Sequence, residues 1–324
     1  MQGLGVVDLQ KFELLEEEVG AILPLVREVA SQHDSVEDPD FLDEVSTYAQ
    51  ELPRRLRRFL NAFRLTEPSG VCVISGYPVN DSKIGKTPTH WRSEEPVNAS
   101  TLEEEVFLNV CGALLGDAIA WAHQREGLIC QDLVPIEEDQ HLMLGSGSEV
   151  ELVWHTEDAR YSYRGDYIGL MCLRNPDRVP TTYASIDDID LDSKHVDVLF
   201  KPQFVFHPDP SHPTDTESET AAILFGDKDS PYVRFDPYSM DTPEDREARQ
   251  AFYYLQEKIN EKIIGVALEP GDVMFIDNYK AVHGRNSFVA RFDGTDRWLK
   301  RITIARDLRA SRSVREAPNS RLIL

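Results

Sequence analysis

The feature that most constrains the fold of this chain is the spacing of three potential metal ligands: His155, Glu157 and a distant His283. On a β-strand, side chains at positions i and i+2 point to the same side, so His155 and Glu157 can contact one metal ion while Thr156 points away. The third ligand must then come from another strand, far along the chain. Two histidines and a carboxylate on one face of the metal are the typical ligands of a non-heme Fe(II) site with open positions.

The residues around His283 strengthen this interpretation. A turn at 271–272, an apolar strand to residue 276 and a polar break precede the histidine, and Arg297 and Arg301 follow it. A guanidinium is a planar, always charged fork that matches a carboxylate. An Fe(II) enzyme that uses 2-oxoglutarate needs such a group for the distal carboxylate of that cosubstrate.

The first third of the chain is predicted to be helical with one strand. Residues 9–30 and 41–63 carry apolar residues at the three- and four-residue spacing of amphipathic helices, with a break at Pro53. Residues 70–76 form a short apolar run bounded by glycines, which is typical of a buried strand. A further helix is expected from Thr101 to about His123.

The periodicity changes at Gln131. From there, short apolar runs alternate with Gly, Pro, Asp and Ser clusters, which favours a β-sandwich or jelly roll. One more helix is expected from Asp241 to about Lys262, inserted between strands. In a double-stranded β-helix, residues 152–157 would supply the first ligand strand and residues 274–276 would lead to the second.

Composition excludes some classes of function. The net charge of −23 argues against nucleic acid as a partner, because its phosphates would repel the protein. The four cysteines show no CxxC spacing and lie in or beside apolar stretches, so we expect reduced core thiols. The N-terminus lacks a basic, then apolar, leader pattern, and no run reaches the roughly 20 apolar residues of a membrane helix. We expect a cytoplasmic protein without a membrane partner.

Four motifs together resemble the clavaminate synthase-like Fe(II)/2-oxoglutarate oxygenases, in particular the hydroxylases of free arginine, asparagine and lysine. The resemblance extends from about Gly70 to Arg312 and implies a mostly β fold with helical decoration around a double-stranded β-helix, or jelly-roll, core. The motifs are the His-Thr-Glu-Asp of 155–158, the Gly-Asp-x-x-x-x-Asp-Asn of 271–278, His283-Gly284-Arg285, and the Asp-Gly-Thr-Asp-Arg-Trp of 293–298.

The resemblance also implies a domain organisation. We expect one oxygenase domain over residues 1–324, which could assemble as a homo-oligomer. Its parts would be a largely helical N-terminal region over 1–125, a jelly-roll core over 126–312 with the inserted helix near 241–262, and a tail over 313–324.

By the same resemblance, His155, Glu157 and His283 would hold Fe(II), and 2-oxoglutarate and O2 would be the cosubstrates. Arg297 would bind the distal carboxylate of 2-oxoglutarate, helped by the hydroxyl of Thr181, with Thr182 as the alternative. Related halogenases lack the ligand carboxylate, so the presence of Glu157 argues against halogenation.

Four further residues match positions that bind the amino-acid substrate in this family. Arg301 would bind its α-carboxylate, and Gln124 and Ser146 would contact its backbone end, although Gln124 could instead cap a helix and Ser146 could serve a turn. Asp236 falls where relatives place an acid against the substrate side chain. An unpaired buried charge is costly, so a cationic side chain would satisfy this acid.

The choice of cation depends on the residue two positions after Asp236. Arginine hydroxylases of the family have a second acid at this spacing, whereas this chain has Tyr238. A single acid beside an aromatic ring suits an ammonium group, through a salt bridge and a cation–π contact. The sequence therefore favours free L-lysine, hydroxylated at C3 or C4, with arginine second and citrulline, ornithine and asparagine further back.

Other interpretations are compatible with the sequence. The chain could be a non-catalytic jelly-roll binding protein, although every identified ligand position is filled. A structural Zn²⁺ site would prefer four closed ligands with cysteines, and none of the cysteines is near the triad. The substrate could instead be attached to a carrier protein or peptide. The polar segment 207–219, with His207 and His212, is either a lid over the site or an ordinary surface loop.

Overall fold

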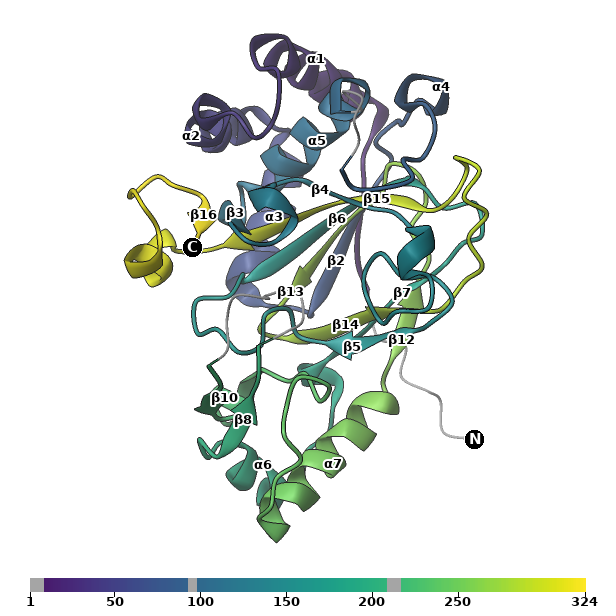
Figure 1. Ribbon diagram of the computed structural model, residues 1–324. Helices are drawn as coiled ribbons and strands as arrows, with labels where there is room; N and C mark the ends of the chain where they lie inside the picture. The colour runs from purple at the N-terminus through teal and green to yellow at the C-terminus, as the bar shows by residue number, and fades with distance from the viewer. Residues whose placement is uncertain (1–8, 93–97, 209–216) are drawn as a thin grey trace, which may run out of the picture.

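Two β-sheets face each other, with helices on both outer sides, in the computed structural model, which describes residues 9–92, 98–208 and 217–324 (Figure 1). The larger sheet runs β1-β2-β13-β6-β15-β3-β16, and β4 also pairs with β15. The smaller sheet runs β12-β7-β14-β5. Strands distant in sequence are neighbours in both sheets, as the jelly-roll expectation requires.

The strands differ in how completely they are covered. Those at the centre of the larger sheet are buried along nearly their whole length because both faces are packed, so they consist of continuous apolar runs. The larger sheet consists of β1 (Gln10–Glu13), β2 (Val71–Ser75), β3 (Asp117–Trp121), β4 (Gln131–Leu133), β6 (Tyr167–Arg174), β13 (Val273–Asp277), β15 (Trp298–Ala305) and β16 (Leu322–Ile323). The smaller sheet consists of β5 (Leu152–His155), β7 (Thr181–Ser185), β12 (Ile264–Val266) and β14 (Ala281–Arg285). Two hairpins lie outside the sheets, β8 (Phe204–Phe206) with β9 (Glu219–Ala221) and β10 (Leu224–Asp227) with β11 (Ser230–Val233).

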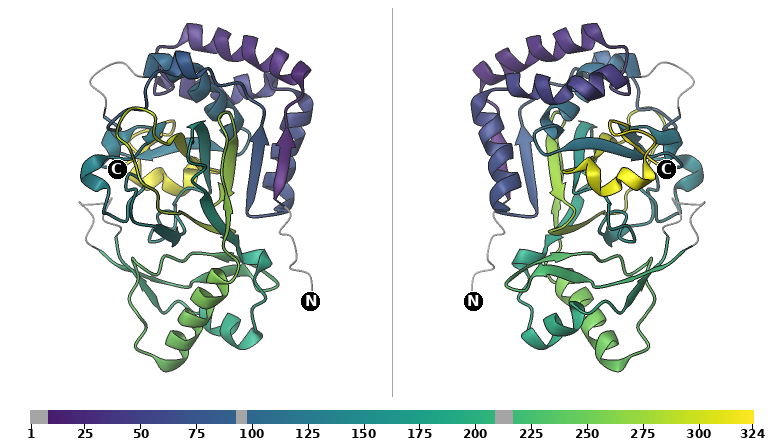
Figure 2. Two further views of the ribbon diagram at one scale, coloured as in Figure 1. Left: turned by 90° about the vertical axis from the view of Figure 1, so that its right-hand side faces the viewer. Right: turned by 90° about the vertical axis from the view of Figure 1, so that its left-hand side faces the viewer.

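The helices form two groups on opposite sides of the sheets (Figure 2). One group packs on the outer face of the larger sheet: α1 (Glu16–Gln32), α2 (Pro39–Tyr48), α3 (Arg54–Thr66) and α5 (Asn98–Gly112), with the short α4 (Asp81–Ile84) nearby. The other, α6 (Ser193–Leu199) and α7 (Arg246–Asn260), packs below the smaller sheet. Short 3-10 helices complete the described chain: η1 (Ala49–Glu51), η2 (Arg125–Gly127), η3 (Glu137–Asp139), η4 (Ile186–Asp188) and η5 (Leu308–Val314).

Of the four apolar cores among the described residues, three follow from this layering. The first lies between the N-terminal helices and the larger sheet, the second between the two sheets, and the third between the smaller sheet and α6 and α7. In the second core, Leu170 of β6 and Leu299 of β15 face Tyr183 of β7 and Ala281 of β14. At the open end of the space between the two sheets, side chains of both sheets line one cavity.

The N-terminal part departs from the sequence prediction in two places. The expected helix from residue 9 begins only at Glu16, because Gln10–Glu13 pair in parallel with β2 as an edge strand. The expected helix to His123 ends at Gly112, and Asp117–Trp121 pair with β15 instead. Both strands form through contacts with residues far away in sequence, which local periodicity does not reveal.

Other boundaries are closer to expectation. The break at Pro53 is confirmed, since α2 ends at Tyr48 and α3 begins at Arg54. The inserted helix begins at Arg246 rather than near Asp241, because the Asp245 side chain accepts a hydrogen bond from the Ala248 N–H, 2.9 Å away, and caps the helix there. The C-terminal tail joins the larger sheet through β16.

The cysteine prediction is confirmed: all four cysteines are buried and unpaired. Burial raises the pKa of the Cys172 thiol to about 12, so this residue stays a neutral thiol. Among the described helices, none combines the length and the apolar content needed to cross a membrane.

Candidate active site

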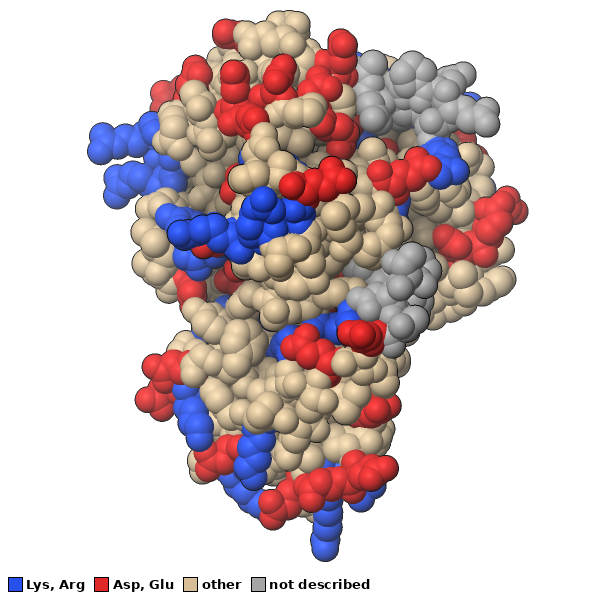
Figure 3. Space-filling model, turned by 60° about the vertical axis from the view of Figure 1, so that its left-hand side comes forward, with Lys and Arg blue, Asp and Glu red and all other residues tan. Residues whose placement is uncertain are grey.

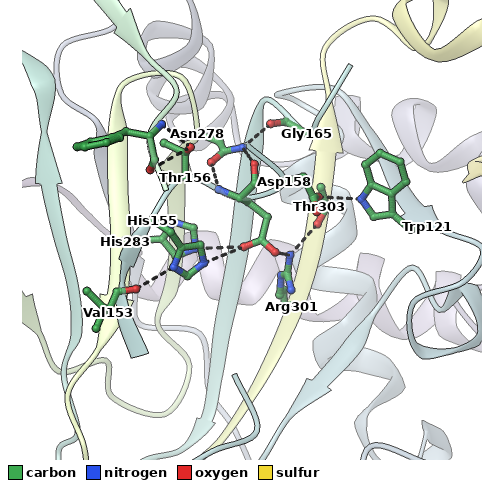
Figure 4. A network of polar contacts seen from close by, with 12 residues as sticks. Trp121, Val153, His155, Thr156, Asp158, Gly165, Asn278, His283, Arg301 and Thr303 are labelled. Atoms are coloured by element: carbon green, nitrogen blue, oxygen red, sulfur yellow. Dashed lines mark hydrogen bonds and ion pairs between the residues drawn. The ribbon is translucent and has the colours of Figure 1, made fainter. Parts of the chain in front are cut away.

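Two adjacent strands of the smaller sheet, and the segment that directly follows one of them, bring the three predicted metal ligands together (Figure 4). His155 is the last residue of β5, and it lies directly opposite His283 of β14 in the antiparallel register. The Nε2 atoms of His155 and His283 lie 3.6 and 3.4 Å from the Oε2 atom of Glu157. One potential ligand atom from each of the three residues lies within 4.8 Å of the other two. Among the described residues, this is the only cluster of His, Cys, Asp or Glu side chains close enough to hold a metal ion.

Glu157 is not on the same strand as His155, contrary to the prediction from the sequence. β5 ends at His155, so Glu157 is outside the strand, and the backbone turns into the left-handed region at Asp158 (φ 51°). Asn278 holds this segment instead: its Oδ1 accepts the Glu157 N–H at 2.7 Å, and its Nδ2 donates to the Glu157 carbonyl at 3.0 Å. The carboxylate still faces the same side as His155.

The donor set fits an Fe(II) ion. The Nδ1 of His155 lies 2.9 Å from the carbonyl of Val153, so a proton on Nδ1 is satisfied by the backbone and the lone pair of Nε2 is free for a metal. Two imidazole nitrogens and one carboxylate oxygen, with no cysteine, are the ligand types that suit a non-heme iron site.

Arg301 contacts Glu157 directly. Its Nη2 lies 2.6 Å from Oε1 of Glu157, on the carboxylate oxygen that does not face the histidines. Burial works to raise the pKa of Glu157, but Arg301 and the two histidines outweigh it and hold that pKa well below its usual range. The Glu157 carboxylate is therefore ionised.

Arg297 and Thr181 meet between the two sheets. Nη2 of Arg297 donates to Oγ1 of Thr181 over 3.1 Å, and both side chains line the cavity described below, whereas Thr182 does not. Burial, together with the like charge of Arg285, lowers the pKa of Arg297 to about 10, so the guanidinium remains charged at neutral pH. Within the described residues no carboxylate lies at ion-pairing distance from Arg297.

A cavity of about 590 Å³ opens at the metal cluster and is lined by both sheets. Residues Gln124, Ser146, Asp236 and Arg301, the predicted substrate contacts, all line it. Ser146 donates through Oγ to Oδ2 of Asp139 at 2.5 Å, so it orients an acid of the wall.

The charged side chains on one face of the molecule, with basic groups among many acidic ones, are visible in Figure 3.

Asp236 is tied to the ligand segment by its neighbour. The backbone N–H of Thr156 donates to the carbonyl of Phe235 at 3.0 Å, and Oγ1 of Thr156 accepts the N–H of Phe235 at 3.0 Å. Asp236 is 8% exposed, and its Oδ1 accepts the N–H of Tyr238 at 3.1 Å. Tyr238 is itself 54% exposed at the rim, where water weakens any cation–π contact.

Three residues of the site escaped the sequence reasoning. Arg125, in η2, lines the cavity, and burial together with the like charge of Arg301 lowers its pKa to about 10. Asp139, in η3, supplies the acid held by Ser146. Asn278 was visible only as part of the Gly-Asp-x-x-x-x-Asp-Asn motif. The first two lie in short 3-10 helices without a recognisable motif.

The polar segment 207–219, for which the sequence leaves a lid and a surface loop open, is described only at its ends. His207 lines the cavity, and its ring nitrogens contact Oγ of Ser218 at 2.7 Å and Oδ1 of Asp241 at 2.8 Å. These contacts make His207 a structural bridge rather than a metal ligand. His212 and the rest of 209–216 lie outside the described residues.

Comparisons with known proteins agree with this geometry. Residues 191–303 match the family described as Taurine catabolism dioxygenase TauD, TfdA family. The enduracididine beta-hydroxylase of Streptomyces hygroscopicus is 42% identical over 96% of this chain and 98% of its own length. The L-ornithine/L-arginine 3-hydroxylase of Catenulispora acidiphila is also 42% identical, over 94% and 96%. The crystal structure of the non-heme iron oxygenase OrfP with Fe, succinate and (3S)-hydroxy-L-Arg matches with a TM-score of 0.92 and 38% identity, covering 97% of this chain and 99% of that one.

The comparisons correct the preference for lysine. The L-lysine 3-hydroxylase of Catenulispora acidiphila is 31% identical to this chain, well below the 42% of the L-ornithine/L-arginine 3-hydroxylase from the same organism. Lysine was favoured because Tyr238 replaces a second acid, but the exposed Tyr238 ring does not make the pocket specific for an ammonium group. The substrate class, a small-molecule amino acid, is unaffected.

Other predictions are confirmed. OrfP has been crystallised with Fe and alpha-ketoglutaric acid, which agrees with the predicted iron and 2-oxoglutarate. The jelly-roll fold class and the assignment to an oxygenase rather than a non-catalytic binding protein hold as well. This chain belongs to the TauD/TfdA family, among its clavaminate synthase-like Fe(II)- and 2-oxoglutarate-dependent amino-acid hydroxylases.

Proposed function

We propose that His155, Glu157 and His283 bind the Fe(II) of this hydroxylase, and that Arg297 with Thr181 binds the distal carboxylate of 2-oxoglutarate. Iron and 2-oxoglutarate, when bound, supply the oxidising chemistry for an unactivated C–H bond. The support for Arg297 is its buried charge: an isolated buried cation is costly, and an anionic ligand offsets that cost. Its hydrogen bond to Thr181 leaves the other guanidinium nitrogens for a bidentate contact.

The substrate that we propose is free L-arginine, hydroxylated at C3, with L-ornithine next. The relatives that are 42% identical are named as acting at the β position or at C3, on enduracididine and on ornithine or arginine. OrfP has been crystallised with L-Arg and with (3S)-hydroxy-L-Arg. Hydroxylation at C3 fits a substrate whose α-carbon end is held close to the metal.

Opposite charges along the cavity wall support the binding of a zwitterion near the iron. Arg301, and Arg125 beside it, would bind the α-carboxylate. Asp139, Ser146 and Gln124 line the same cavity and would bind the α-ammonium group. Because these groups recognise only the amino-acid end, they do not select among side chains.

The single observation that carries the substrate proposal is the buried carboxylate of Asp236 in the wall of the cavity that contains the metal cluster. One of its oxygens is used by the Tyr238 N–H, and none of the described cationic side chains pairs with it. A guanidinium or an ammonium group on the substrate would provide the missing partner. A neutral side chain would leave the acid unpaired, at a cost of about 1–3 kcal/mol.

The test is mass spectrometry on single amino acids incubated with the protein, Fe(II), 2-oxoglutarate, ascorbate and air. Arginine, ornithine, lysine, citrulline and asparagine run in parallel, each scored for one added oxygen and an equal amount of succinate. The proposal predicts that arginine is converted fastest, with ornithine next. Conversion of lysine ahead of both would overturn the substrate assignment, and succinate without any oxidised amino acid would indicate a carrier-bound substrate.

The ligand assignment is tested separately. His155→Ala, Glu157→Ala and His283→Ala are each expected to abolish Fe(II)-dependent succinate formation while the far-UV circular dichroism spectrum stays that of the wild type. Full activity in any of the three would remove that residue from the ligand set.

A further inference from the structure

The amide of Asn278 contacts the backbone of Glu157 through both of its edges (Figure 4). Oδ1 accepts the Glu157 N–H at 2.7 Å, and Nδ2 donates to the Glu157 carbonyl at 3.0 Å and to the Gly165 carbonyl at 2.9 Å. The side chain has no exposed surface. With an acceptor and two donors engaged, the amide has one orientation that satisfies all three hydrogen bonds.

Glu157 depends on this contact because it has no strand partner. β5 ends two residues earlier, at His155, and the chain turns through a left-handed residue at Asp158. Within the described part of the chain, the N–H and the carbonyl of Glu157 have hydrogen bonds only to Asn278. The carboxylate end is fixed separately, by Arg301. Asn278 therefore sets the position of the backbone from which the carboxylate extends.

The turn that carries Asn278 also leads into the strand of another ligand. Asn278 follows β13, and its own N–H donates to the Asp166 carbonyl at 2.8 Å. β14 begins three residues later at Ala281 and contains His283. Through this turn, the position of Glu157 is thus coupled to that of His283, although the two residues come from distant parts of the chain.

We propose that Asn278 is a positioning residue for the metal site, which holds Glu157 in register with His155 and His283. This inference rests on the ligand assignment proposed above. Partners that orient metal ligands without touching the metal typically change metal affinity or activity by about 10–100-fold when removed. Asn278 acts through the backbone of the ligand, so its loss should weaken metal binding more than it weakens the fold.

Asn175 provides a matched control. It is also a buried asparagine that makes three hydrogen bonds to the backbone: Nδ2 donates to the carbonyls of Val179 at 3.1 Å and Leu268 at 3.0 Å, and Oδ1 accepts the Val179 N–H at 2.9 Å. None of its partners is a metal ligand. Asn175→Ala therefore removes the same number and kind of hydrogen bonds as Asn278→Ala, away from the metal cluster.

The experiment measures the Kd for Mn(II) alone, from the electron paramagnetic resonance signal of the free ion, together with the thermal unfolding midpoint. For Asn278→Ala we expect the Kd to rise by about 10–100-fold. Both variants should lower the unfolding midpoint, and by similar amounts. Asn175→Ala should keep the wild-type Kd. A wild-type Kd in Asn278→Ala would overturn the inference, as would an equal rise in both variants.

A second variant covers the case in which Asn278→Ala does not fold. Asn278→Asp keeps the volume and the Oδ1 acceptor but places an oxygen against the Glu157 and Gly165 carbonyls, and it should also raise the Kd. Failure of both variants to fold, with Asn175→Ala folded, would make Asn278 a folding residue and overturn the inference. Glu157→Ala tests the ligand assignment alone: if it binds Mn(II) with the wild-type Kd, the proposed function fails, whatever Asn278 does.

Discussion

Arg301 and Glu157 form a largely buried ion pair, with 2.6 Å between Nη2 and Oε1. The sequence had indicated Arg301 as the residue for the substrate α-carboxylate. The pairing adds a second role, because the guanidinium occupies the carboxylate oxygen that faces away from the histidines and leaves Oε2 towards them. One arginine would thus connect the proposed metal site to the proposed α-carboxylate contact of the substrate.

Replacing Arg301 should therefore affect every substrate alike. Arg301→Met removes the partner of a buried carboxylate and the proposed α-carboxylate contact, and breaking such a pair costs about 2–5 kcal/mol. We expect kcat/KM for arginine and for ornithine to fall by a similar factor, on the order of 30-fold or more. The measurement is steady-state succinate formation with each amino acid. A loss confined to one of them would contradict this role.

The proposed cosubstrate contacts can be tested with neighbouring threonines. Thr181→Val removes the hydroxyl that accepts from Arg297 and should raise the KM for 2-oxoglutarate by about 10-fold or more, since a hydrogen bond to a charged group contributes about 1.5–3 kcal/mol. Thr182→Val is the control, because Thr182 is equally buried but does not line the cavity. Arg297→Ala should raise the same KM further. An unchanged KM in Thr181→Val would refute the pairing as a cosubstrate contact.

Asp236 should select for charge rather than for shape. Arginine and citrulline have nearly the same shape, but only arginine carries a cation. Asp236→Asn should lower the ratio of kcat/KM for arginine to that for citrulline by about 10–100-fold, which corresponds to one charged hydrogen bond. Competition between the two amino acids, followed by mass spectrometry, measures this ratio directly. Equal losses for both would make Asp236 a structural acid.

A buried cation supports the sheet behind the active site. Nζ of Lys300 lies 2.8 Å from Oε1 of Glu105 and 2.7 Å from Oδ1 of Asp132, with all three side chains buried. Lys300→Met leaves two uncompensated carboxylates and should reduce the free energy of unfolding by about 3–5 kcal/mol. Lys258→Met, which breaks an exposed pair with Glu261, should cost less than about 1 kcal/mol. Urea denaturation measures the free energy of unfolding of both variants. Equal and small losses would contradict a stabilising role for Lys300.

The pH dependence of stability should include a contribution from Asp277. Burial, together with the nearby Glu67 and Asp166 carboxylates, raises the pKa of Asp277 to about 7. The unfolded chain releases this proton near pH 4, so the contribution of Asp277 to stability is complete below that pH and is lost as the pH rises to about 7. Asp277→Asn keeps an Oδ1 acceptor for the Tyr279 and Lys280 N–H groups and should lose less stability between pH 5 and pH 8. An identical pH dependence in urea denaturation would contradict this.

The cluster of potential metal ligands could be predicted from the sequence because a local spacing and a motif indicate its residues. His155 and Glu157 are two residues apart, and His283 lies in a run of turn, strand and polar break. The three residues do lie together as predicted, but the predicted strand position of Glu157 was wrong, since Glu157 is outside β5 and held by Asn278. A side-chain clamp from a distant turn has no signal in local periodicity.

The parts that escaped prediction depend on contacts between distant segments. β1 and β3 lie at the ends of segments that the sequence predicts as helices, from apolar spacing and from an N-cap, but they form strands because they pair with β2 and β15. Arg125 and Asp139 reach the cavity from short 3-10 helices whose positions the larger sheet determines. The side-chain specificity of the pocket was misjudged because the exposure of Tyr238 is a property of the folded surface.

Hydroxylation of arginine at C3 can be tested with L-arginine in which both hydrogens on C3 are replaced by deuterium. The protein is incubated with this substrate, Fe(II), 2-oxoglutarate and air, and the product is examined by mass spectrometry and by NMR. Hydroxylation at C3 predicts a product that has gained one oxygen and lost one of its two deuterons, with one equivalent of succinate. A hydroxylated product that retains both deuterons, or no conversion of arginine at all, would contradict it.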